Sequence, residues 1–365
     1  MTAPFSLEDV LQAAATRGAS EVHLKVPSPP LLRVHGRLER LTSFAGLRPA
    51  ETEEVLGDLL ASLPHSAKQH EFDRTGEVAF AYAHPELGRF RISAYRQRGS
   101  VSIVVRLVPF GVPRFDELGL PAGARSLVAH GDGLVLVTGG VKSGVTSTLA
   151  ALVDVMNDTS ERSIVTIEDP IELLHSDRRC SINQREVGLD TPSVAEALAR
   201  VLGHDPDVVM VGTLPDLAST EAAIGLADAG ILVLAAITSQ GAGDAVERIV
   251  RRHPESRQGH ARATLASSLR GVVAQQLLPS ADGTDGRQLV VELMLGTPTV
   301  RRAIAEGADA ARLAALIDDD PASGMVPFEL ALAQLVHERR ITLEVARRAT
   351  RNPVRLGTIL PDPPA

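Results

Sequence analysis

The stretch that decides the fold is GLVLVTGGVKSGVTSTL, residues 133–149. A short apolar run, 134–137, leads into a turn rich in glycine and small hydroxyl residues, and the apolar spacing of a helix follows. This order of strand, turn and helix start is the pattern of a P-loop, whose backbone N–H groups and helix N-terminus hold phosphate. A plain tight turn explains the glycines but not the whole context. We therefore predict a phosphate-binding loop.

The motif G-x-x-x-x-G-K-[ST] fits this stretch except at its lysine, where Val145 stands. Lys142, three positions upstream, would have to fold its stem back over the phosphates to replace it, and a solvent-facing lysine is the simpler reading. Thr146 occupies the position of the hydroxyl that binds Mg²⁺. The residues predicted to contact nucleotide are Gly139, Gly140, Lys142, Ser143, Gly144, Val145, Thr146 and Ser147.

Composition sets limits on the function. The chain has 365 residues, 44% of them hydrophobic, and its 37 Lys and Arg against 45 Asp and Glu give a formal net charge of −8. This charge gives no support for general binding to nucleic acid. The single cysteine, Cys180, excludes a disulfide framework and a cysteine-based zinc site. No apolar run approaches a membrane span and no signal peptide is evident, so we expect a cytoplasmic protein.

The chain upstream of the P-loop predicts a small α/β domain over residues 1–107. Ser6 and the acidic residues after it indicate the start of a helix, and β-rich stretches follow in a mainly antiparallel pattern. The strands are expected at 21–26, 31–34, 77–82, 89–95 and 101–107. Prolines and a glycine then predict a linker at 108–123.

The P-loop stretch opens a second domain, expected over 124–298. Continuous Val, Ile and Leu strands that alternate with helical patterns predict a parallel sheet covered on both faces. The strands are expected at 134–138, 163–167, 208–211, 232–237 and 290–295, and the helices from 144 and around 194–202 and 219–229. Residues 299–365 read as a C-terminal helical region, with helices at 300–306, 308–317, 328–338 and 343–348.

Two further strand ends fall where open α/β sheets bind ligands. Glu168 closes the stretch Thr166–Glu168 and could orient water or a metal-bound phosphate. If the P-loop were absent, an acidic loop exposed to solvent would be the better interpretation of this carboxylate. The run 208–211 matches a Walker B strand, whose closing carboxylate activates the attacking water. Thr213 stands at that position, and threonine cannot act as a general base at neutral pH.

These stretches together resemble the type IV pilus retraction ATPases, the PilT-like branch of the secretion ATPase superfamily. The motifs that carry the resemblance span almost the whole chain: 133–138 with its loop, 166–172, 183–187, 205–207 with 211–212, and 296–298. The family implies a PAS-like N-terminal domain, a RecA-like second domain and a hexameric ring with ATP between domains and subunits. By this resemblance Arg91, Arg96 and Arg106 face the nucleotide, and the absence of a four-cysteine module favours the retraction branch.

The departures from the family pattern fall on reactive groups. The Walker A lysine is Val145, the Walker B glutamate is Thr213, and the histidine of the His box is Thr238. A lost charge-assisted hydrogen bond to phosphate costs ~1.5–3 kcal/mol, so ATP and Mg²⁺ are expected to bind weakly. A lost general base costs a further ~10²–10⁴ in rate.

The sequence leaves three functions open. The favoured one is a degenerate pilus-motor subunit that works by assembly or regulation with a related motor ATPase and the inner-membrane platform of the pilus machine. It would form a homo- or hetero-hexamer, peripheral to the membrane, without nucleic acid. The alternatives are a divergent but active hexameric retraction ATPase that uses Lys142 and Glu168, and a P-loop protein that binds another phosphorylated ligand.

Overall fold

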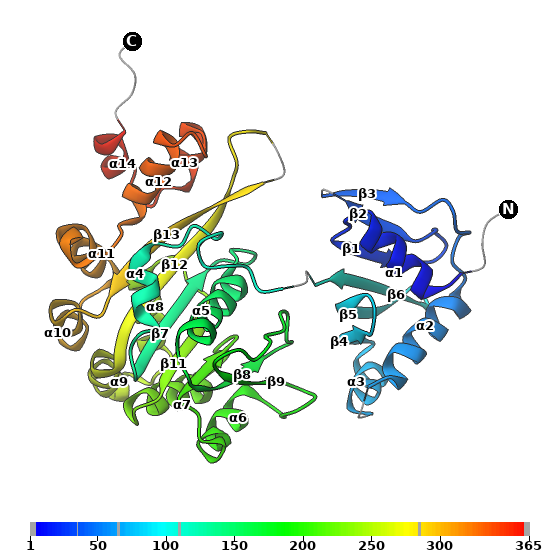
Figure 1. The fold of residues 1–365 in the computed structure, drawn as a ribbon, viewed down its shortest axis with the longest axis horizontal. Coiled ribbons are helices and arrows are strands. Elements are labelled where there is room, and N and C mark those ends of the chain that lie inside the picture. The colour runs from blue at the N-terminus through cyan, green and yellow to red at the C-terminus, as the bar shows by residue number, and fades with distance from the viewer. Residues whose placement is uncertain (1–4, 35, 64–65, 109–110, 284–285, 361–365) are drawn as a thin grey trace, which may run out of the picture. The chain divides into compact units, whose positions relative to one another are not determined.

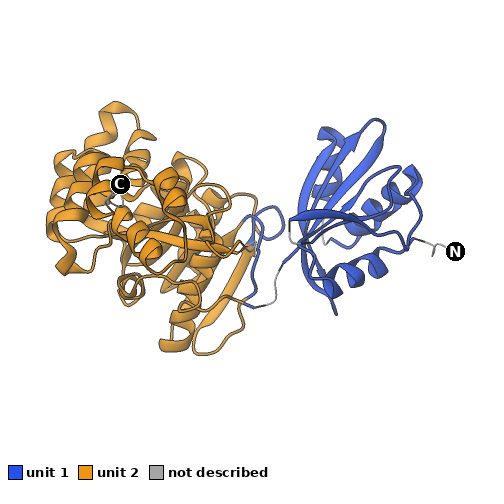
Figure 2. Ribbon diagram, turned by 90° about the horizontal axis from the view of Figure 1, so that it is seen from above, with its two compact units in different colours: residues 1–111, 169–174, 186–190 blue, residues 112–168, 175–185, 191–365 orange. Residues whose placement is uncertain are grey.

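The computed structural model describes residues 5–34, 36–63, 66–108, 111–283 and 286–360. The chain separates into two compact units (Figure 2). Unit 1 comprises residues 1–111, 169–174 and 186–190, and unit 2 comprises 112–168, 175–185 and 191–365. The expected boundaries at 107, 123 and 298 stay predictions, and residues 109–110 of the expected linker lie outside the described residues.

Two inner segments, 169–174 and 186–190, pack with unit 1, although they fall within the range expected for the nucleotide-binding domain. Arg89 accounts for this packing. Its Nε donates to the carbonyl of Ile171 at 3.1 Å, and its guanidinium pairs with the buried Glu186 carboxylate at 2.5 Å. The N–H of Ile171 also donates to Glu186, at 3.2 Å.

Unit 1 is built on a six-stranded antiparallel sheet in the order β3-β2-β1-β6-β5-β4 (Figure 1). Its helices α1, α2 and α3 pack on the sheet through buried side chains such as Leu11, Leu56 and Phe72. Ser6 caps α1 as the sequence predicts, accepting from the N–H of Asp9 at 3.3 Å. The elements are α1 Leu7–Thr16, β1 Glu21–Leu24, β2 Leu31–Val34, β3 Arg37–Arg40, α2 Pro49–Ala61, α3 Ala67–Thr75, β4 Glu77–His84, β5 Gly88–Gln97 and β6 Ser100–Leu107.

Unit 2 is built on a seven-stranded sheet in the order β13-β12-β7-β11-β10-β8-β9. The five strands from β12 to β8 run parallel, and β13 returns antiparallel to β12. The strands are β7 Gly133–Gly139, β8 Ser163–Glu168, β9 Ser181–Glu186, β10 Val208–Val211, β11 Leu232–Ile237, β12 Leu269–Pro279 and β13 Arg287–Leu295.

Helices cover both faces of this sheet. Every residue of β7, β10 and β11 is buried, which requires cover on both sides. Side chains of α4 and α5 share one apolar core with alternate strand residues such as Val135 and Val137. The helices and 3₁₀ turn of this part are α4 Ala122–Leu127, α5 Val145–Thr159, α6 Val194–Arg200, η1 Val201–His204, α7 Leu217–Asp228, α8 Ala242–Arg251 and α9 Glu255–Ser268.

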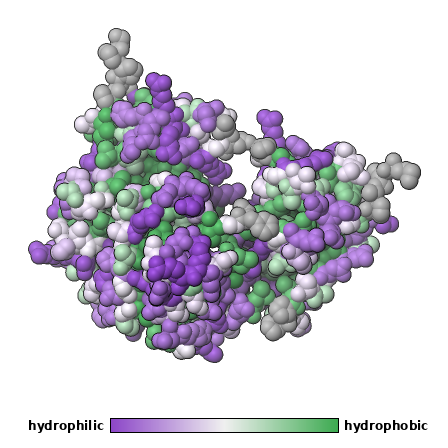
Figure 3. Space-filling model, viewed as in Figure 1, coloured by the Kyte–Doolittle hydropathy of each residue, from purple (hydrophilic) through white to green (hydrophobic). Residues whose placement is uncertain are grey.

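The C-terminal end is helical, as expected (Figure 1). Its last three helices form a small apolar core with Leu278 of β12 and Val290 of β13. The elements are α10 Pro298–Glu306, α11 Ala310–Asp319, η2 Pro321–Ser323, α12 Phe328–His337, α13 Leu343–Ala349 and α14 Pro353–Ile359. In the described part of the chain, no helix is both long and apolar enough to cross a bilayer. Hydrophilic and hydrophobic residues are interspersed on the face shown in Figure 3.

The predicted α/β architecture is confirmed: an antiparallel N-terminal sheet, a mainly parallel second sheet and a helical C-terminal end. Sequence analysis missed the strands β3, β9 and β12, and it named no helix at the positions of α2, α3, α8 and α9. β12 is central to the site because it pairs in parallel with β7, from Leu269 opposite Leu134 to Gln275 opposite Gly139.

Candidate nucleotide-binding site

The P-loop joins β7, an interior strand of the sheet, to the N-terminus of α5. Two of its glycines are fixed by geometry. A Cβ on Gly139 would lie 2.2 Å from Ser143 Oγ and 2.6 Å from the carbonyl of Gln275, so a side chain does not fit there. Gly144 caps α5 with a φ of +86°, a conformation that favours glycine. The predicted order of strand, turn and helix is therefore present.

Lys142 and Val145, the residue at the position of the motif lysine, lie in different surroundings. Lys142 is exposed, has a φ of +65° in the left-handed region, and makes no ion pair or hydrogen bond in the described part of the chain. Val145 is half-buried and packs on the apolar core that includes Leu149 of the same helix. The valine therefore contributes to the core of unit 2 and offers no positive charge to a phosphate.

Gln275 of β12 holds the P-loop in place. Its Nε2 donates to the carbonyl of Ser143 at 2.8 Å, and its Oε1 accepts from the Thr148 hydroxyl at 2.8 Å. The side chain is 2% exposed, so both bonds are shielded from water. Sequence analysis missed this residue, and the only signal was a pair of glutamines inside an apolar run.

Glu168 ends β8 as predicted, but its carboxylate is engaged. Oε1 accepts from the Thr166 hydroxyl at 2.6 Å and from Gln184 Nε2 at 3.0 Å, and the side chain is buried. Gly212, which follows β10, approaches it closely: a Cβ there would lie 3.7 Å from Glu168 Cγ. The structure thus brings the end of β8 beside the end of β10, while Glu168 is occupied by structural hydrogen bonds.

The ends of β10 and β11 carry Thr213 and Thr238, at the two positions where the family pattern leads us to expect reactive groups. Thr213 is half-buried, and Thr238 is exposed at the rim of a cavity of about 750 Å³. Within the described residues neither hydroxyl makes a hydrogen bond. The scaffold around them is intact, because Thr138 of β7 donates to the carbonyl of Ile237 at 2.5 Å and shares a 2.7 Å hydrogen bond with Ser239.

The arginines predicted to face the nucleotide all lie in unit 1, where each has a carboxylate partner. Arg91 pairs with Glu172 at 3.3 Å, Arg96 with Glu53 at 3.1 Å, and Arg106 with Glu21 at 2.9 Å. Arg91 and Arg106 are opposite each other on β5 and β6. Their role toward a nucleotide stays a prediction.

Glu21 pairs with three basic side chains: Arg106, Arg33 and His23. Burial alone would raise the pKa of Glu21, but hydrogen bonds from Arg33, Arg106 and His23 lower that pKa to about 2. Glu21 therefore remains a carboxylate throughout the neutral range, and Arg106 keeps its partner there.

The loop fits the phosphates of a nucleotide better than it fits a bound metal. The Oγ of Ser143 is buried and has no hydrogen-bond partner among the residues that the structure describes, and the first N–H groups of a helix lack partners within it. Gly139, Gly140, Ser143, Gly144, Thr146 and Ser147 would surround a phosphate here. Thr146, the predicted Mg²⁺ ligand, is half-buried at the second position of α5. Among the described residues, no group of three or more His, Cys, Asp and Glu side chains is placed to hold a metal.

The comparisons with known proteins match this architecture. The family model described as type II/IV secretion system protein matches residues 76–326. The chain belongs to this family. It is 34% identical over 349 residues to the type IV pilus retraction ATPase PilT of Pseudomonas aeruginosa, which covers 96% of this chain and 99% of the relative. It is 35% identical to the type IV pilus ATPase PilU of the same organism, over 94% of this chain and 88% of the relative.

Among solved structures, the pilus retraction motor PilT with bound ADP superposes on this family member with a TM-score of 0.88 at 34% identity. The match covers 97% of this chain and 100% of that chain. The resemblance to the PilT-like branch is therefore confirmed, and so is the fold expected from it: a small N-terminal α/β domain, a RecA-like P-loop domain and a helical C-terminal end.

Proposed function

We propose that this chain is a degenerate PilT-like subunit of a type IV pilus motor in twitching motility. It binds ATP weakly through the P-loop, hydrolyses it slowly or not at all, and acts by assembly or regulation. Its partners are a related motor ATPase subunit, in a homo- or hetero-hexamer, and the inner-membrane platform of the pilus machine on the cytoplasmic side. The relatives with pilus functions cover nearly the whole chain and support this assignment.

One observation carries the proposal of weak catalysis. The P-loop scaffold is complete, with Gln275 holding Ser143 and Thr148, while the neighbouring strand ends present hydroxyls at Thr213 and Thr238. A hydroxyl cannot take a proton from water at neutral pH, so the general base is missing. The departures from the family pattern therefore lie at the reactive positions, while the strands and the loop that hold those positions are in place.

The alternative is an active retraction ATPase that uses Lys142 and Glu168. The exposed, unpaired Lys142 favours this candidate, since it is free to move toward a phosphate. Glu168 disfavours it, because its Oε1 already accepts hydrogen bonds from the Thr166 hydroxyl and from Gln184 Nε2. Glu168 would have to exchange those partners to act as a base.

Steady-state ATPase measurements on the purified protein, alone and mixed with an active motor ATPase of the same cell, test the proposal. We expect turnover at least ~10²-fold below the active relative and co-elution of the two proteins in one ring by light scattering. Turnover near that of the relative, abolished by Lys142→Ala, would establish the active alternative. A protein that stays monomeric with every motor partner would contradict the subunit assignment. Saturable binding of another phosphorylated ligand without competition by ATP would establish the third reading.

A further inference from the structure

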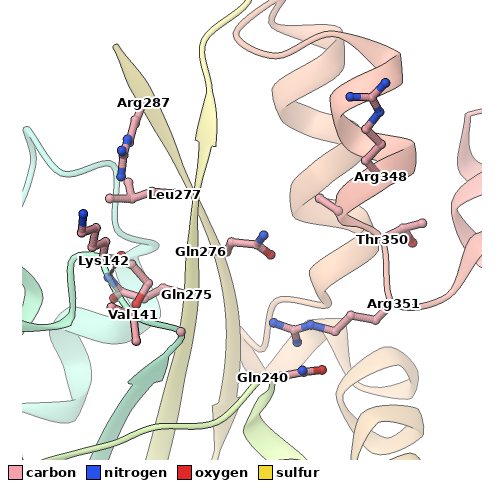
Figure 4. A pocket seen from close by; sticks show the side chains of 13 residues that line it. Val141, Lys142, Gln240, Gln275, Gln276, Leu277, Arg287, Arg348, Thr350 and Arg351 are labelled. Atoms are coloured by element: carbon pink, nitrogen blue, oxygen red, sulfur yellow. Dashed lines mark hydrogen bonds between the residues drawn. The ribbon is translucent and has the colours of Figure 1, made fainter. Parts of the chain in front are cut away.

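A cavity of about 600 Å³ lies between the P-loop and the C-terminal helical region of unit 2 (Figure 4). The P-loop residues 140–143 form one wall, β12 and the start of β13 a second, and residues 348–351 a third. The volume is in the range of small-molecule sites. Because the wall at 140–143 is the P-loop itself, this cavity is continuous with the phosphate cradle.

The charge of the cavity lining is one-sided. Among the described residues that line the cavity, four are cationic, Lys142, Arg287, Arg348 and Arg351, and none is acidic. Figure 4 shows that these cations come from three separate parts of unit 2: the P-loop, the start of β13 and the C-terminal helical region, with Arg348 on α13 and Arg351 on the connection that follows it. A concave surface with only positive charge attracts anions.

Two of the four cations are already neutralised. Arg348 pairs with Glu344 at 2.5 Å. Arg351 pairs with the buried Glu292 at 2.6 Å and lies over the Phe328 ring at 3.8 Å. Lys142 and Arg287 form no ion pair or hydrogen bond with any described residue. The available positive charge of the cavity is therefore on these two side chains.

We propose that Lys142 and Arg287 together replace the Walker A lysine that Val145 removed, by binding phosphate groups of a nucleotide held in this cavity. The inference rests on the proposed nucleotide binding and extends it to a residue of β13. A guanidinium offers a fork of N–H donors that matches phosphate oxygens, and a lysine adds a mobile point charge. Amide and hydroxyl groups of Gln276 and Thr350 line the same cavity and supply neutral hydrogen bonds.

Calorimetric titration at fixed ionic strength tests the inference, with ATP, ADP and inorganic tripolyphosphate as probes. The variants are Arg287→Gln, Lys142→Gln and their combination, with Arg302→Gln as the matched control. Arg302 is an exposed arginine of α10 outside the cavity lining, so its substitution removes the same charge elsewhere. We expect each cavity variant to weaken ATP and tripolyphosphate binding about tenfold, and the control less than about twofold.

The same substitution is also tested in the Val145→Lys variant, which restores the motif lysine. If the restored lysine and Arg287 bind the same phosphates, Arg287→Gln should weaken ATP binding less than about threefold in this variant. If Arg287→Gln and Arg302→Gln change ATP affinity equally, the inference is overturned, but the proposed ATP binding at the P-loop is not contradicted. Failure of wild type to bind any probe at millimolar concentration would also overturn it, whereas the ring-assembly measurement decides the proposed function separately.

Discussion

On the β12 side of β7 the P-loop is held by buried hydrogen bonds to Gln275, whereas on the β11 and β10 side the strand ends present Thr238 and Thr213 without side-chain partners in the described part of the chain. The backbone frame is in place on both sides, because β7 pairs in parallel with β12 and with β11. On the β11 side, the Thr138 hydroxyl also hydrogen-bonds to Ile237 and Ser239. The two sides differ in their chemistry. On one side a buried amide holds the loop, and on the other the strand ends present hydroxyls, which cannot act as general bases at neutral pH.

The largest effect should come from restoring the reactive side. Val145→Lys, Thr213→Glu and Thr238→His combined return the phosphate cation, the general base and the His-box histidine. We expect ATP hydrolysis to rise by at least ~10²-fold over wild type, because a positioned base alone contributes ~10²–10⁴. A coupled phosphate-release assay measures this.

The matched control for that triple variant carries Thr213→Gln in place of glutamate, since glutamine has the same size but cannot accept a proton from water. It should remain at the wild-type rate. Equal activity of the glutamate and glutamine forms would show that the β10 end is not the side on which catalysis was lost.

A smaller effect is expected from breaking the retained side. Gln275→Leu leaves the carbonyl of Ser143 and the hydroxyl of Thr148 without their buried partner, which should lower the free energy of unfolding by about 2–4 kcal/mol. Urea denaturation followed by circular dichroism measures this change. The adjacent, exposed Gln276 supplies the control, and Gln276→Leu should change stability by less than about 0.5 kcal/mol. If both variants unfold alike, Gln275 does not hold the loop.

The smallest effect concerns the one strained position of the loop. Lys142→Gly should raise the free energy of unfolding by about 0.5–1 kcal/mol, because relief of the left-handed φ of +65° exceeds the extra unfolded-state entropy of glycine. The same substitution should weaken ATP binding, since it removes a cavity cation. Lys142→Ala removes the charge but keeps the strain. Equal melting temperatures of the glycine and alanine variants would show that backbone strain at Lys142 does not lower the stability.

Sequence reasoning reached the P-loop, the strand end at Glu168 and the threonines at 213 and 238 because local order encodes them. An apolar run, a glycine turn and a helical pattern are contiguous, and each lies within about twenty residues. It missed Gln275, because it missed β12, and it also missed Arg287, the first residue of β13. These residues follow the P-loop by more than a hundred positions, and only the pairing of β12 with β7 and of β13 with β12 brings them beside it.

The sequence by itself determined that a phosphate loop is present and that its lysine is absent, since both facts are read from residues 139–146 alone. Only the tertiary structure decided what surrounds that loop. It showed that Gln275 holds it, that the carboxylate of Glu168 is engaged, and that Lys142 and Arg287 are the cations left unpaired among the described residues lining the cavity. The physical reason is that burial, ion pairing and available charge depend on which strands and helices, distant in the sequence, come into contact. A local sequence pattern does not specify those contacts.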